Sequence, residues 1–220
     1  MLELANVDLA GETDTLLQSV SVRIQPGELC CIRAGVLDGS TSLLRCMAGI
    51  REPDSGRCLI DGRSPDAIGD AELPRLVSLC HESGGLVSLF DTFENIALPL
   101  VYHWNAGDKD VYERVMPVVQ ALNVEDCLGH RVHQLNDVQR RLICLARGLV
   151  LGSRLLLVDE LQEGMSPAQR DDILDYLVNT CRQNGLSMVM TTTAGDVTHF
   201  ADRHFEIRDR GLQELHGVAH

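Results

Sequence analysis

Short apolar runs alternate with longer helical patterns along most of this chain. The clearest runs are RLLLVDE (154–160), LSMVMTT (186–192) and HFEIRD (204–209), and a helix is predicted at about 168–182, between the first two. Strands joined by crossover helices pair in parallel and are buried on both faces. The pattern therefore predicts an α/β fold built on a parallel sheet. Since 220 residues leave little room for a second domain, we expect residues 1–220 to form one domain.

Two parts of the chain depart from this alternation. Near the N-terminus, the apolar runs 2–7, 20–24 and 29–33 are separated by stretches too short for helices. They predict an antiparallel ribbon that leads into the first parallel strand. From about 83 to 139 the pattern is mostly helical, most clearly at 94–98, 111–122 and 138–149, which predicts an inserted helical subdomain.

Charge and cysteine content limit the classes of partner. The formal net charge is -13, with 32 acidic residues against 19 Lys and Arg, so a nucleic-acid partner is not expected. Eight scattered cysteines in apolar runs are typical of small core residues in a reducing compartment. No apolar stretch reaches the length needed to span a bilayer. We therefore expect a cytoplasmic protein without direct membrane insertion, whose membrane role comes through a partner.

The segment that follows residues 29–33 is a loop, AGVLDGST, and then a helical pattern that stops near Gly49. This arrangement stands in one order with LLRCMAGI, EPDSGRCLIDGR, ENIALPL, LARGLVLGSRLLLVDE and ADRHFEIRD. The whole series resembles the nucleotide-binding domain of ABC transporters over nearly the full chain. The resemblance implies a P-loop NTPase (RecA-like) core with an N-terminal antiparallel β ribbon and an inserted helical subdomain. Residues 83–100, SGGLVSLFDTFENIALPL, specifically resemble the ATPase subunits of Mla-type lipid transport systems.

The loop AGVLDGST, residues 34–41, stands where the family has its phosphate loop, GxxxxGK[ST]. There, N–H groups surround the phosphates and the lysine adds a positive charge. Here Ser40 replaces the lysine, and Asp38 adds a carboxylate where a small neutral residue is usual. The phosphate-binding positions that the resemblance implies are Gly35, Asp38, Gly39, Ser40, Thr41 and Ser42, with Thr41 also on the magnesium side. We expect ATP and Mg²⁺ to bind weakly or not at all.

Other family positions can be assigned in the same way. The resemblance gives Asp159 the magnesium position and Glu160 that of the residue that polarises the attacking water. It places His81 at a glutamine position that contacts magnesium and this water, and Thr193 at the switch histidine. The signature LSGGQ reads LNDVQ here, so the signature positions are Asn136, Asp137, Val138 and Gln139. The stretch VDLAGETD, residues 7–14, contains no aromatic residue for stacking on adenine.

These replacements affect phosphate contacts, whereas the fold-building segments follow the family. The favoured interpretation is a degenerate, non-hydrolytic subunit with a structural or regulatory role in transport, in which lipids are a candidate cargo. It would dock on a membrane permease through a groove near residues 83–100, with contact candidates Leu86, Leu89, Phe90 and Phe93, and would form a homodimer or pair with a second ABC subunit. Two alternatives stay open: an active ATPase with variant motifs, and a soluble module of the same fold that binds another ligand.

Overall fold

A three-stranded antiparallel sheet forms the N-terminal edge of the molecule. The computed structural model describes residues 1–12, 14–35, 37–81, 85–193 and 199–215. Strand β1 (Leu2–Ala10) pairs with β2 (Thr15–Ile24) on one side and with β4 (Ser55–Ile60) on the other, antiparallel in both cases. This confirms the predicted ribbon and adds β4, which the sequence did not indicate.

A six-stranded sheet forms the centre, in the order β5-β6-β7-β3-β8-β9. Its strands are β5 (Val77–Cys80), β6 (Leu155–Val158), β7 (Ser187–Thr192), β3 (Leu29–Arg33), β8 (Arg203–Arg208) and β9 (Gly211–Leu215). The first five are parallel to one another, and β9 pairs antiparallel with β8. The predicted parallel sheet is therefore confirmed.

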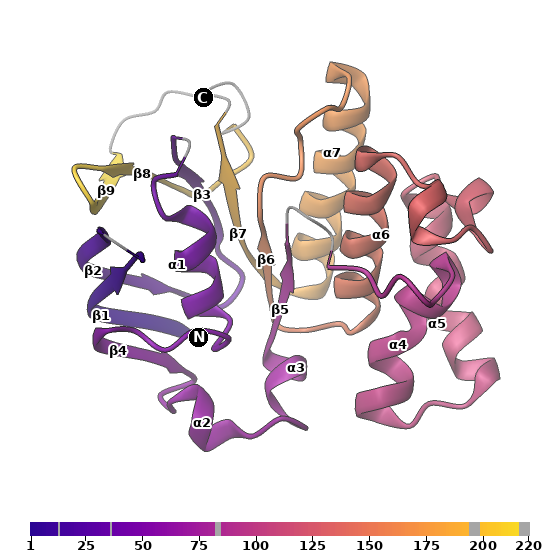
Figure 1. Ribbon diagram of the computed structural model, residues 1–220, viewed down its shortest axis with the longest axis horizontal. Coiled ribbons are helices and arrows are strands. Elements are labelled where there is room, and N and C mark those ends of the chain that lie inside the picture. Colours follow the sequence, from indigo (N-terminus) through magenta and orange to yellow (C-terminus); the bar gives the residue numbers. More distant parts are fainter. Residues whose placement is uncertain (13, 36, 82–84, 194–198, 216–220) are drawn as a thin grey trace.

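Helices cover both faces of this sheet. They are α1 (Ser40–Met47), α2 (Pro65–Ile68), α3 (Leu73–Leu76), α4 (Thr92–Trp104), α5 (Asp108–Ala121), α6 (Asp137–Val150) and α7 (Pro167–Asn184), with 3-10 turns η1 (Glu125–Cys127) and η2 (Val132–Gln134). Figure 1 shows α1 between the two sheets, α6 and α7 on the opposite face, and α4 and α5 outside α6. Helices thus fill the region predicted to be helical, although residues 83 and 84 at its start lie outside the described residues.

Alternate residues of the central strands belong to two separate hydrophobic cores. On β6, Leu155 and Leu157 pack with α1 and the antiparallel sheet, whereas Leu156 and Val158 pack with α6 and α7. This two-sided burial explains why the strand reads as an unbroken apolar run. All eight cysteines are buried and unbridged, as expected of core residues. Among the helices of the described residues, none combines the length and apolar character that crossing a bilayer requires.

Candidate functional site

The phosphate-loop position connects β3 to α1, and its main-chain turn is formed. Gly39 has φ 85°, and a Cβ there would lie 3.1 Å from Leu16 Cβ, so both the turn and the close approach require glycine. Within the loop, the Gly35 N–H donates to Asp38 Oδ2 at 2.6 Å. A carboxylate of the chain therefore takes a main-chain N–H in the loop where the family presents such groups to a phosphate. No Lys or Arg occurs in residues 34–42.

Leu37 is the strained residue of this loop. It has φ 66°, the left-handed region that disfavours a side chain, and it is 91% exposed. The positive φ of Leu37 costs stability, and no burial of its side chain offsets that cost.

Replacing Leu37 by glycine should raise the free energy of unfolding by about 0.5 to 1 kcal/mol, because the strain disappears and little buried area is lost. The measurement is urea unfolding of both proteins. Leu89→Gly is the matched control, since Leu89 is 82% exposed and is not among the residues with positive φ. The control should lose stability through the added freedom of the unfolded chain. Equal losses in both variants would refute the strain at Leu37.

The two candidate magnesium ligands do meet. Thr41 Oγ1, in the first turn of α1, donates to Asp159 Oδ2 at 2.9 Å, and Thr191 Oγ1 of β7 donates to Asp159 Oδ1 at 2.9 Å. Asp159 follows β6 and is 2% exposed. Hydroxyl and carboxylate oxygens suit Mg²⁺. Both carboxylate oxygens already accept a hydrogen bond, however, so a metal ion between Thr41 and Asp159 would have to displace the Thr41 bond. The next residue of α1 is Ser42, whose Oγ accepts a hydrogen bond from Arg51 Nη1 at 3.2 Å.

Glu160 and Thr193 border one small cleft of about 90 Å³, together with Arg170. Glu160 has φ 41°, and its N–H donates to Thr191 Oγ1 at 3.2 Å, so the acid leaves the sheet through a tight turn anchored on β7. His81 follows β5, and its Nε2 lies 2.8 Å from Arg45 Nη2. The structure thus brings Glu160 and Thr193 together and places His81 beside α1.

The signature positions lie at the N-terminus of α6. Asn136 and Gln139 form a capping box: Asn136 Oδ1 accepts from the Gln139 N–H at 2.8 Å, and Gln139 Oε1 accepts from the Asn136 N–H at 2.9 Å. Asp137 is exposed and forms an ion pair with Arg140 at 3.2 Å. The helix end is thus capped by its own side chains and carries an added carboxylate. It borders a cavity of about 600 Å³, with Val138 facing Gly164.

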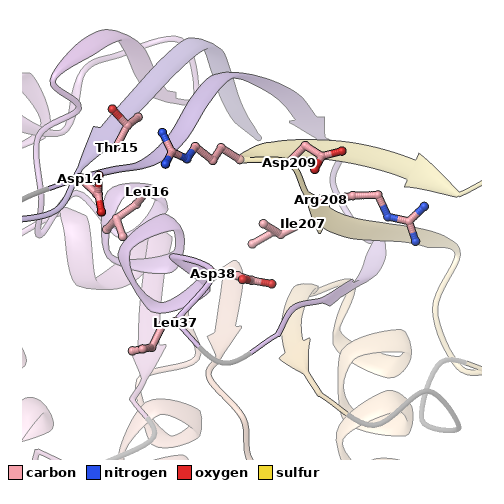
Figure 2. Close-up of a pocket in the computed structure, with 9 residues that line it drawn as sticks. Asp14, Thr15, Leu16, Leu37, Asp38, Ile207, Arg208 and Asp209 are labelled. Atoms are coloured by element: carbon pink, nitrogen blue, oxygen red, sulfur yellow. The ribbon is translucent and has the colours of Figure 1, made fainter.

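An opening beside the phosphate loop was not predicted from the sequence. It has a volume of about 500 Å³ and lies between the start of β2, the phosphate loop and the β8–β9 turn (Figure 2). Its charged side chains are Asp14, Asp38, Asp209, Arg208 and Arg210, and none of its nine lining residues is aromatic. A stacking platform for a base is therefore missing among the lining residues. Residues 208–211, RDRG, form the β8–β9 turn at this edge, and no role was predicted for them from the sequence.

Known proteins of similar sequence indicate the family to which the chain belongs. A family model described as "ABC transporter" matches residues 17–163. The macrolide export ATP-binding/permease protein MacB of Brucella abortus (strain 2308) is 29% identical over 208 residues, which cover 93% of this chain and 31% of that protein. The methionine import ATP-binding protein MetN of Mannheimia succiniciproducens is 27% identical over 218 residues, covering 96% and 63% respectively. The chain thus spans a third to two thirds of these relatives' length.

The fold agrees with solved structures as well. The dimeric post-hydrolysis structure of the ATP-binding cassette MJ0796 bound to ADP and Pi superposes with a TM-score of 0.89 at 22% identity, covering 99% of this chain and all of that chain. This confirms the P-loop NTPase fold that the resemblance implied. Because the family model covers most of the sequence and the fold agrees throughout, the chain belongs to the ABC transporter family.

Proposed function

We propose that this chain is a degenerate ATP-binding-cassette subunit that docks on a membrane permease and stabilises or regulates it without hydrolysing ATP. The observation that carries the proposal is the hydrogen bond from the Gly35 N–H to the Asp38 carboxylate, in a loop without Lys or Arg. This carboxylate occupies a donor that a phosphate would use. It also repels a phosphate at close range, by roughly 4 kcal/mol for unit charges 4 Å apart at an effective dielectric constant of 20.

The signature end of α6 supports the same proposal. In an ABC dimer, that end would approach the nucleotide held by a second subunit. Here the capping box already uses the N–H of Gln139, and Asp137 adds a negative charge beside it. A homodimer, or a pair with a second ABC subunit, would therefore bring carboxylates to both halves of each composite site. We infer that pairing does not rely on a shared nucleotide.

An apolar cleft of about 240 Å³ is a candidate for the permease contact. It lies between α3, β5, α4 and α6, and Leu73, Leu79, Pro99 and Leu151 contribute to its lining. Ile50 also lines it and is 67% exposed. A cleft of this character suits a short amphipathic helix. Relatives such as MacB, named as an ATP-binding/permease protein, support a permease partner and a peripheral position on the cytoplasmic side of a membrane.

Only part of the segment 83–100 contributes to that surface. Pro99 lines the cleft, and Leu89 is exposed at 82%. Leu86 and Phe93 are partly buried and pack against the core of the helical region, and Phe90 is half-buried. Residues 83 and 84 lie outside the described residues. We propose lipids as the first cargo class to test, since this segment resembles lipid-transport ATPase subunits.

A second candidate is an active ATPase with variant motifs. The contact between Thr41 and Asp159 favours it, because these side chains meet as they would around a magnesium ion, with Glu160 next in the chain. This candidate requires tight nucleotide binding despite Asp38.

Calorimetric titration of the purified chain with ATP and Mg²⁺ separates the two candidates. We expect no binding heat up to millimolar ATP, which corresponds to a binding free energy weaker than about -4 kcal/mol. Micromolar affinity would overturn the degenerate-subunit proposal. ATP turnover that is present in the unaltered chain and absent from Glu160→Gln would then establish the second candidate. MetN or another nucleotide-binding relative, titrated under the same conditions, serves as the positive control.

A further inference from the structure

Two buried polar atoms without a hydrogen-bond partner lie in or next to the apolar cleft of about 240 Å³. Among the described residues, the buried side-chain atoms that lack a partner are Ser78 Oγ, Trp104 Nε1 and Arg141 Nε. Ser78 lines the cleft and is 7% exposed. Trp104 is the last residue of α4, whose Pro99 also lines the cleft. Unpaired buried polar atoms cost stability, so the fold alone does not explain Ser78 Oγ and Trp104 Nε1.

Two arginines contact Trp104 without an acidic partner. Arg75 Cζ, from α3, lies 5.6 Å from the centroid of the indole ring, and Arg114 Cζ, from α5, lies 4.8 Å from it. A cation over the face of a ring uses none of its N–H donors for that contact. Within the described part of the chain, neither guanidinium group forms a hydrogen bond or an ion pair, and both residues are exposed. We call Arg75, Trp104 and Arg114 the arginine clamp, because its N–H donors remain available to an anion.

The acids near Arg114 leave the clamp positively charged. Asp110 lies one turn earlier on α5, but the described residues show no ion pair between them, and Glu113 pairs with Lys109 at 3.7 Å. The chain as a whole has a formal net charge of -13. The clamp is therefore a local positive site on an acidic protein. Guanidinium groups bind carboxylates through paired, charge-assisted hydrogen bonds, so a carboxylate of a partner fits this site.

The clamp continues the apolar cleft. Leu73 and Pro74 of α3 line the cleft, and Arg75 follows them directly. Figure 1 shows α3 and the turn between α4 and α5 in the same, lower part of the molecule. Along α4, the rise per residue places Trp104 about 7.5 Å beyond Pro99. Among the described residues that line the cleft, none is acidic. A helix of two or three turns seated in the cleft would therefore reach the clamp.

We propose that the cleft and the clamp together bind one short amphipathic helix of the permease. Its apolar side chains fill the cleft, and its aspartate or glutamate accepts hydrogen bonds from Arg75 and Arg114. Rotation about one side-chain bond turns the Ser78 hydroxyl toward a polar atom of the same helix. The inference rests on the proposed permease docking and names the chemistry of the docked segment. Because the protein is acidic overall, a partner carboxylate is attracted at the clamp and repelled elsewhere, which fixes the direction of the bound helix.

The test selects binders of the full chain from a displayed library of helical peptides. Each peptide is about four turns long and has leucines at helical spacing along one face, with the other positions random. We expect Asp or Glu to be enriched at least about tenfold over Lys and Arg in one terminal turn of the selected peptides, since the two guanidinium groups bind a carboxylate there.

Three double variants show whether the clamp causes this preference. Arg75→Gln with Arg114→Gln should still bind the selected peptides but lose the preference for an acid. Arg75→Lys with Arg114→Lys keeps both charges and should retain part of it. Arg23→Gln with Arg57→Gln, at exposed positions of β2 and β4, changes the net charge equally and should retain all of it. Urea unfolding of each variant checks that it is folded under the selection conditions.

Ile50→Asn separates the clamp from permease docking itself. Ile50 lines the cleft and is 67% exposed, so its replacement should weaken the binding of every selected peptide by at least about tenfold without unfolding the chain. If Ile50→Asn weakens the peptides but acids are not enriched, or if glutamines at the clamp leave the enrichment unchanged, the clamp inference is overturned and docking in the cleft stands. If Ile50→Asn weakens no peptide, docking in the cleft fails together with the clamp.

Discussion

The double variant Asp38→Ser, Ser40→Lys is expected to bind ATP with Mg²⁺ at least about 100-fold more tightly than the unaltered chain. The first change frees the Gly35 N–H and removes the carboxylate that would face a phosphate. The second adds the cation that the loop lacks. Each change involves unit charges near 4 Å, where interactions reach roughly 4 kcal/mol before solvent screening of the half-buried loop. About 2.7 kcal/mol suffices for a hundredfold gain.

Calorimetry of the double variant beside both single variants measures this gain. A control with the same change in net charge, Asp172→Ser with Ser88→Lys at exposed positions away from the loop, should bind no more tightly than the unaltered chain. If the double variant stays as weak as the control, the phosphate loop is not the barrier. The missing adenine contact and the capped signature would then have to explain the weak binding.

The sequence predicted those elements whose apolar pattern is strong. Leu29–Arg33 is fully apolar except at its end and was placed correctly, because both of its faces are buried. Strand β4, Ser55–Ile60, was missed: its first three residues are exposed, and its pairing with β1 depends on a partner about fifty residues away. Strand β9, Gly211–Leu215, has no fully buried residue, so its pairing with β8 left no hydrophobic signal.

The sequence predicted where the candidate site residues lie in the fold better than it predicted which of them contact one another. The pair Asn136 and Gln139 is a capping pattern that sequence alone can reveal, and the bond from Gly35 to Asp38 spans three residues. In contrast, the bond between Thr41 and Asp159 joins residues 118 positions apart. Contacts of that kind arise from the order of strands in the sheet, which local pattern does not specify.

The contact of Thr41 with Asp159 also gives a reason for an acid beside a phosphate loop that contains no Lys or Arg. Asp159 joins three elements: α1 through Thr41, β7 through Thr191, and β5 through its own N–H, which donates to the Cys80 carbonyl at 2.9 Å. A buried carboxylate with two hydroxyl donors is well satisfied and holds these elements in register. The residue therefore has a structural role that needs no magnesium.

Asp159→Ala is accordingly expected to lower the free energy of unfolding by about 2 to 3 kcal/mol, because it leaves the Thr41 and Thr191 hydroxyl groups without their shared acceptor in a site that is 2% exposed. Asp159→Asn retains one acceptor oxygen and should lose about half as much. Glu160→Gln, at the adjoining half-buried acid, is the control and should change stability by less than about 0.5 kcal/mol.

Urea unfolding with and without millimolar Mg²⁺ measures the stability of all four proteins. If Mg²⁺ stabilises the unaltered chain and this gain disappears in Asp159→Asn, Asp159 is a metal ligand and the structural explanation fails. If stability is independent of Mg²⁺ and follows the hydrogen bonds, the fold itself accounts for the acid.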